Sequence, residues 1–63
     1  MIYRCYLLDK ADRIAGREHF HAEDDNAATD RTREFLFQVN YAAAELWVSS
    51  RLVVRLDNEG KPT

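Results

Sequence analysis

Residues 45–56 read ELWVSSRLVVRL, and this stretch decides which kind of fold the chain can form. Its two halves are rich in β-branched and aromatic residues, and Ser49 and Ser50 interrupt them. This pattern predicts two short strands joined by a tight turn. Because neighbouring residues of a strand point to opposite faces, Leu46 and Trp47 lie on opposite faces of the hairpin. Both faces therefore carry apolar side chains.

The length of the turn decides which residues share a face. If the turn is Ser49-Ser50 alone, Trp47 pairs with Leu52; if the loop also includes Arg51, Trp47 pairs with Val53. The longer loop separates apolar from mixed positions better, and matched apolar faces define the register of a hairpin. We therefore favour the longer loop. One face would then hold Glu45, Trp47, Arg51, Val53 and Arg55.

The N-terminal third of the chain predicts a second hairpin. Residues 1–9 (MIYRCYLLD) alternate as a strand does, and residues 14–23 (IAGREHFHAE) form a weaker strand pattern. Residues 9–13 (DKADR) join the two strands, and the side chains of Asp9 and Asp12 favour a turn there by bonding to the backbone. Gly16 indicates a bulge, which would move Glu18 off an otherwise apolar face.

Between the two hairpins the period of the apolar residues changes from two to about 3.6, which predicts a helix over residues 25–39. The acidic start at residues 24–26 suits helix capping and the positive end of the helix dipole. The stripe that would face the sheet comprises Ala28, Thr32, Phe35, Leu36 and Val39. Asn40 can end the helix in a left-handed conformation, whereas the helix propensity of residues 42–44 favours an extension.

The order strand, strand, helix, strand, strand predicts an α+β fold: a small ββαββ domain whose four-stranded antiparallel sheet packs one helix on one face. We expect a single domain over residues 1–57 and a polar, frayed C-terminal tail over residues 58–63. A domain of this size buries only about 60% of its extended-chain surface. Cys5 is the only cysteine, so no disulfide can form within the chain, and we expect it to be a small buried residue.

Composition excludes several classes of protein. A net charge of −2 argues against broad binding to nucleic acid or to anionic membranes. No apolar run approaches the ~20 residues of a transmembrane helix, and charged residues interrupt the N-terminus where a signal peptide would be apolar. We therefore expect a cytoplasmic protein with no membrane segment.

One helix can cover only one face of the sheet, so the apolar residues of the other face predict a partner. Oligomerisation is also a common route to stability for a chain this short. We expect a homodimer formed through the uncovered face or an edge of the sheet, and an unidentified protein partner would use the same surface. The predicted interface residues are Tyr6, Trp47 and Val53, with Arg51 and Arg55 at the rim.

Two alternatives use the same sheet. Tyr6, Trp47, Arg51 and Arg55 would also suit stacking and phosphate contacts with single-stranded nucleic acid, although the acidic net charge favours a dimer face. His19 and His21 point the same way in a strand and are the candidate ligands for a metal or small molecule.

No motif for cofactor or catalytic chemistry accompanies these residues. A zinc site needs about four ligands, and no second His or Cys cluster joins the two histidines, so we predict no metal and no cofactor. The chain has no Gly-rich phosphate loop, nucleophile elbow or CxxC pair. We therefore predict no catalytic residues and no enzyme.

Four segments carry a resemblance that spans most of the chain: 3–9 (YRCYLLD), 22–25 (AEDD), 45–47 (ELW) and 51–53 (RLV). In these the chain resembles short proteins of alphaproteobacteria, especially rhizobia, that have no assigned function. It departs from them at Arg13, where a glycine is expected, and in a serine turn that lacks a glycine. The resemblance implies a bacterial, stand-alone small protein and carries over no catalytic residues.

Overall fold

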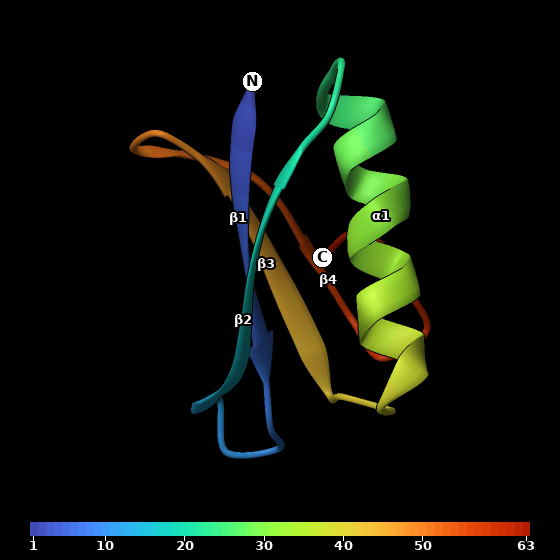
Figure 1. The fold of residues 1–63 in the computed structure, drawn as a ribbon. Helices are drawn as coiled ribbons and strands as arrows, with labels where there is room; N and C mark the ends of the chain where they lie inside the picture. Colours follow the sequence, from blue (N-terminus) through green and yellow to red (C-terminus); the bar gives the residue numbers. More distant parts are fainter.

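One helix and four strands make up the fold. The structure, a computed structural model, describes all 63 residues. The elements are β1 (Ile2–Leu8), β2 (Ile14–His21), α1 (Asp25–Gln38), β3 (Ala43–Val48) and β4 (Arg51–Leu56). All neighbouring strands are antiparallel, in the order β2-β1-β3-β4, and α1 lies along one face of the sheet (Figure 1). The predicted α+β class and ββαββ order are confirmed.

The core lies between α1 and the sheet. Alternate residues of the two central strands point toward the helix, as the period of two requires. The apolar members of this cluster are Tyr3, Cys5, Leu7, Ala28, Leu36, Ala44, Leu46, Val48 and Leu56. Thr32 is the buried polar residue of the helix, and its hydroxyl donates to the Ala28 carbonyl at 2.9 Å, so burial leaves no donor without a partner.

Cys5 is fully buried at the centre of this core, as predicted. Burial raises the pKa of its thiol to about 11, and the nearby Glu18 carboxylate adds to the effect. The side chain is therefore a neutral thiol at neutral pH and packs as a small apolar group.

Both ends of α1 are capped by residues that the sequence singles out. The Asp24 carboxylate accepts the backbone N–H of Ala27 at 2.8 Å, which satisfies one free donor of the first turn. At the other end Asn40 adopts a left-handed conformation with φ 58°. The N–H of Tyr41 then donates to the Leu36 carbonyl at 3.1 Å, the bond expected of a Schellman cap.

The helix does not extend through residues 42–44, in spite of their alanine content. Ala43 and Ala44 instead begin β3, where they pair with Leu8 and Leu7 of β1. Both alanines are buried, and Ala44 belongs to the core. Pairing with a central strand thus outweighs the helix propensity of alanine, which is a preference of less than about 1 kcal/mol per residue.

The turn between β3 and β4 is shorter than expected. Trp47 pairs with Leu52, so the turn is Ser49-Ser50 alone and the longer loop is wrong. A register shift follows, in which Leu46 pairs with Val54 and leaves Val53 without a partner. Because of this bulge, Val54 and Leu56 pair with residues of β3 that point toward the core. In a strand without a bulge, they would do so only if the loop were one residue longer.

A second bulge lies in β2. Leu7 pairs with Gly16 and Leu8 with Ile14, so the unmatched residue is Ala15. Glu18 pairs with Cys5 and stays on the helix side of the sheet, contrary to the expectation that a bulge would remove it. Its side chain reaches water because β2 is an edge strand.

Asp9 organises the turn between β1 and β2. Its Oδ1 atom accepts the backbone N–H groups of Ala11 at 2.8 Å and Arg13 at 3.0 Å. These two hydrogen bonds lower the pKa of the Asp9 carboxyl, and the bond from Arg13 has the larger effect. Asp12, with φ 61°, occupies the left-handed position of the turn, and aspartate tolerates this conformation. The turn therefore needs no glycine at position 13.

Residues 57–63 are folded back on the domain, whereas their composition predicts a frayed tail. The backbone N–H of Thr63 donates to the Arg55 carbonyl at 2.9 Å, along the outer edge of β4. The Arg33 side chain of α1 donates its Nε–H to the Gly60 carbonyl at 2.7 Å. The outer edge of β4 is thus partly covered, and β2 is the open edge of the sheet.

We predict that Ser49→Gly stabilises the protein. Ser49 has φ 52°, a conformation that costs a residue with a side chain about 1 kcal/mol and glycine almost nothing. The free energy of unfolding, measured by urea titration, should rise by up to about 1 kcal/mol.

Ser50→Gly is the matched control, because Ser50 does not have a positive φ. That change should lower the free energy of unfolding by about 0.5 kcal/mol through added freedom of the unfolded chain. A Ser49→Gly protein less stable than the parent would show that the left-handed turn is not the conformation in solution.

Candidate interaction surface

The face of the sheet opposite α1 is the candidate functional site, and we call it the outer face. No helix lies over it (Figure 1). Cross-strand pairing places residues of all four strands side by side on this face. They are Ile14, Arg17, His19 and His21 of β2, Ile2, Arg4, Tyr6 and Leu8 of β1, Glu45 and Trp47 of β3, and Leu52 and Arg55 of β4.

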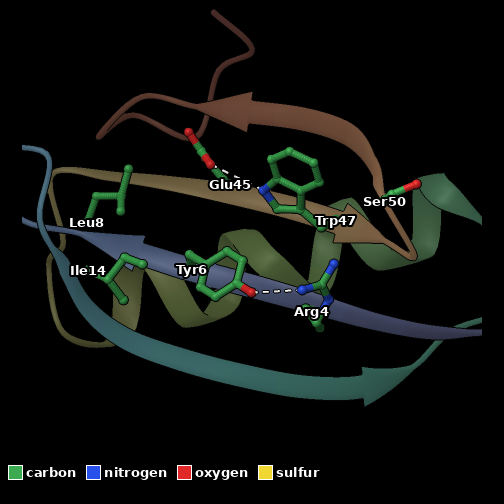
Figure 2. A pocket seen from close by; sticks show the side chains of 7 residues that line it. All are labelled: Arg4, Tyr6, Leu8, Ile14, Glu45, Trp47 and Ser50. Carbon is green, nitrogen blue, oxygen red and sulfur yellow. Dashed lines mark hydrogen bonds between the residues drawn. The ribbon is translucent and has the colours of Figure 1, made fainter.

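A depression of about 340 Å³ lies over the two central strands of the outer face. Its lining residues are Arg4, Tyr6, Leu8, Ile14, Glu45, Trp47 and Ser50. Figure 2 shows Leu8 and Ile14 at one end, Arg4 and Ser50 at the other, and the two aromatic rings between them. One end of the depression is therefore apolar and the other is cationic.

A chain of polar contacts holds the Trp47 ring in place. The indole Nε1–H donates to the Glu45 carboxylate at 3.2 Å, and Arg55 donates to the same carboxylate at 2.9 Å. Arg55 also contacts Asp12 of the β1–β2 turn at 2.7 Å. The hydrogen bonds from Arg55 to Asp12 and Glu45 raise the pKa of its guanidinium. Glu45 is consequently neutralised by a cation that also joins β4 to the β1–β2 turn.

Arg4 occupies the cationic end of the depression. Its Nη1 atom donates to the Tyr6 hydroxyl at 2.9 Å, and its Nη2 atom donates to the Ser49 carbonyl. The guanidinium carbon also lies 5.9 Å from the centre of the Tyr6 ring. Both hydrogen-bond acceptors are neutral, and Arg4 takes part in none of the ion pairs of the structure.

The structure brings together three of the five predicted interface residues. Tyr6, Trp47 and Arg55 share the outer face, whereas Arg51 and Val53 lie on the helix side. The expectation that all five share one face is wrong, because it rests on the longer turn. Arg51 pairs across from a core residue, and Val53, at the bulge, packs against the core cluster.

Sequence reasoning missed Arg4, Ile14 and Leu52 as residues of this surface. Ile14 is 47% exposed and Leu52 is 46% exposed. The signal for Leu52 was available, since the shorter serine turn places it directly opposite Trp47. The alternation of β1 already places Arg4 beside Tyr6, but only the folded chain brings the Ser49 carbonyl to its guanidinium.

His19 and His21 lie on the outer face of edge strand β2, and both are exposed. His19 pairs with Arg4, so its nearest cross-strand neighbour is a cation. No group of three His, Cys, Asp or Glu side chains converges anywhere in the structure. The pair thus supplies two ligands of the roughly four that zinc requires.

Arg51 instead joins a contact that ties three elements together. Its guanidinium lies 3.1 Å from the Asp25 carboxylate at the start of α1, and the buried Tyr3 hydroxyl donates to that carboxylate at 2.8 Å. The hydrogen bonds from Arg51 and Tyr3 lower the pKa of Asp25. Burial, and then the bond to Asp25, raise the pKa of Tyr3. This contact fastens the β3–β4 hairpin and β1 to the helix.

Comparisons with protein-family models, curated proteins and solved structures find no match. α1, the one helix, is too short and too polar to cross a lipid bilayer. The arrangement of side chains on the outer face is therefore the basis for a functional proposal.

We predict that Asp25→Asn destabilises the protein most at neutral pH. The carboxyl has a lower pKa in the folded chain than in the unfolded chain, where it is about 3.9. Its ionised form therefore stabilises the fold above that value, and the contribution disappears as the pH falls through the lower folded pKa. In urea titrations the gap between parent and variant should shrink from pH 7 toward acid.

Asp30→Asn is the matched control, because Asp30 forms an exposed ion pair with Arg33 on the surface of α1. Such pairs contribute about 0–1 kcal/mol, so this variant should remain close to the parent at neutral pH. A gap between Asp25→Asn and the parent that is constant with pH would contradict the role given to the ionised carboxylate.

Proposed function

We propose that the protein is a small, non-enzymatic interaction domain that forms a homodimer through its outer face. The observation that supports this proposal is the row of apolar side chains on a face that no helix covers. Ile14 and Leu52 are about half exposed there, beside the half-buried rings of Tyr6 and Trp47. We further propose a bacterial source, from the resemblance carried by residues 3–9 and 45–47, and a cytoplasmic location.

The charges of the outer face favour one arrangement of the two copies. Arg17 and His19 of β2 lie at one side of the face, and a two-fold axis across the strands would place them against their own copies. An axis along the strands places β2 against β4 and β1 against β3 of the second copy. Residues at the same level of β1 and β3 then face one another, so Arg4 of each copy lies over Trp47 of the other as a cation–π contact, and Tyr6 lies over Glu45.

The size of the face indicates a dimer that dissociates on dilution. Four strands spaced by about 4.8 Å, with six residues rising by about 3.3 Å each, make a face of roughly 20 Å by 20 Å. A standard interface removes about 800 Å² from each partner. The projected area of the face, about 400 Å², is roughly half of that value, so the face alone provides a small interface.

We predict that Trp47→Ala shifts the protein toward the monomer. The change removes the largest apolar group of the face and its contact with Arg4 of the second copy, so the dissociation constant should rise at least tenfold, or about 1.4 kcal/mol. Light scattering over a dilution series measures the effect.

Leu52→Glu tests the same face without removing the tryptophan, because it places a charge opposite Trp47. Val39→Ala is the control, since Val39 is 64% exposed at the end of α1 and lies away from the outer face. If the parent is dimeric and both outer-face variants keep its mass, the dimer uses another surface.

A second candidate function is binding of single-stranded nucleic acid by the same face. The observation that favours it is the group of basic residues on β1 and β2: Arg4, Arg17, His19 and His21 share the outer face, and neither strand adds a carboxylate to it. Tyr6 and Trp47 would supply stacking surfaces beside them.

Binding of nucleic acid by this face should have an affinity that falls steeply as the salt concentration rises. Fluorescence anisotropy with a labelled oligonucleotide should detect binding at low salt, and Arg17→Ala should reduce the slope of affinity against salt by about one. No change in anisotropy at low salt would exclude it.

A further inference from the structure

The depression on the outer face has the form of a small-molecule site. Its volume of about 340 Å³ lies near the lower end of the range for ligand pockets, about 300–1,000 Å³. A space of this size suits a single ring with a short side chain and is small for a nucleotide. Tyr6 and Trp47 flank it from neighbouring strands, while Leu8 and Ile14 close one end (Figure 2).

Arg4, at the other end of the depression, differs from the other half-buried arginines because no carboxylate contacts it. Arg33 and Arg55 are half buried like Arg4, and each of them contacts a carboxylate, at 2.9 Å and 2.7 Å respectively. Arg4 has only a hydroxyl and a carbonyl as acceptors. A guanidinium has five N–H donors, so about three remain free for a planar, bidentate anion. A partly desolvated cation without a counter-ion favours such a ligand.

We propose that this depression binds a small aromatic carboxylate. The ring lies between Tyr6 and Trp47 and toward the apolar end, and the carboxylate contacts the Arg4 guanidinium. Neighbouring contacts hold both parts of the site in place without the ligand: Glu45 orients the indole, and Tyr6 orients Arg4. This preorganisation reduces the entropy lost on binding.

The ligand and a second copy of the chain would compete for the same side chains. Tyr6 and Trp47 would be covered in the homodimer, so the ligand would bind the monomer and shift the equilibrium away from the dimer. By linkage, dimer formation would weaken ligand binding to the same extent. This regulatory part rests on the proposed function, whereas binding to the monomer does not.

The test is a titration of the dilute protein with 3-phenylpropionate, followed by tryptophan fluorescence. Trp47 is the only tryptophan, so the signal comes from the site itself. We expect a saturable change with a dissociation constant in the millimolar range, as for a good ligand of this size. 3-Phenylpropanamide, which keeps the ring and lacks the charge, should bind roughly tenfold more weakly or worse. Hexanoate, which keeps the charge and lacks the ring, should also bind more weakly.

Arg4→Gln should reduce the affinity for 3-phenylpropionate to that of the amide. Arg17→Gln is the matched control, because Arg17 is an exposed cation on the same face but outside the lining of the depression. If Arg4→Gln does not fold, the comparison of acid and amide on the parent protein still decides the role of the charge. No saturable change, or equal affinities for acid and amide, would overturn the proposal; equal binding of hexanoate would overturn its aromatic part.

Light scattering of the concentrated protein separates the two proposals. A mass that falls from dimer to monomer as 3-phenylpropionate is added supports both. Saturable fluorescence changes in a protein that is monomeric at every concentration refute the homodimer and leave the ligand site supported. A dimer with no fluorescence response at any dilution refutes the ligand site and leaves the homodimer supported.

Discussion

A single helix shields one face of a four-stranded sheet, and this constraint determines the rest of the molecule. α1 covers the side that carries Tyr3, Cys5 and Leu46, which are fully buried. The opposite side keeps Trp47 and Tyr6 at the surface, where polar neighbours orient both rings. No other element of these 63 residues lies over that side. The uncovered part of the sheet is therefore the surface on which the functional proposals rest.

The fold class followed from local patterns because each element has its own signal. The change of period at residue 25 marks the helix, and Asp24 and Asn40 mark its two ends. The strand pairs follow from short loops, which require antiparallel neighbours. Buried Cys5 was likewise predictable from its apolar surroundings. These features depend on a few adjacent residues, and such signals are readable without knowing the tertiary structure.

The wrong predictions concern features of the fold that tertiary contacts determine. The bulge at Val53 allows both a two-residue turn and a Val54 side chain that faces the core. No residue type in β4 indicates this bulge from the sequence. With the two-residue turn, Arg51 lies on the helix side and forms an ion pair with Asp25, and Leu52 lies on the outer face instead. The alanines of β3 and the folded C-terminus show the same thing, since pairing with distant strands outweighs local propensity and polar composition. The lack of a counter-ion beside Arg4 is likewise a property of the folded arrangement, which the sequence alone does not reveal.

The asymmetry between the two sheet edges has a consequence for assembly. Residues near the C-terminus lie along β4, while β2 keeps an uncovered row of backbone groups. Edge-to-edge growth of a sheet needs two available sides on every molecule, one to accept a neighbour and one to pass the growth on. Because the β4 edge is partly covered at Arg55 and Leu56, two chains that pair through β2 leave no fully open edge for a third. The position of the C-terminal segment thus makes continuous edge-to-edge growth less favourable than pairing of two chains.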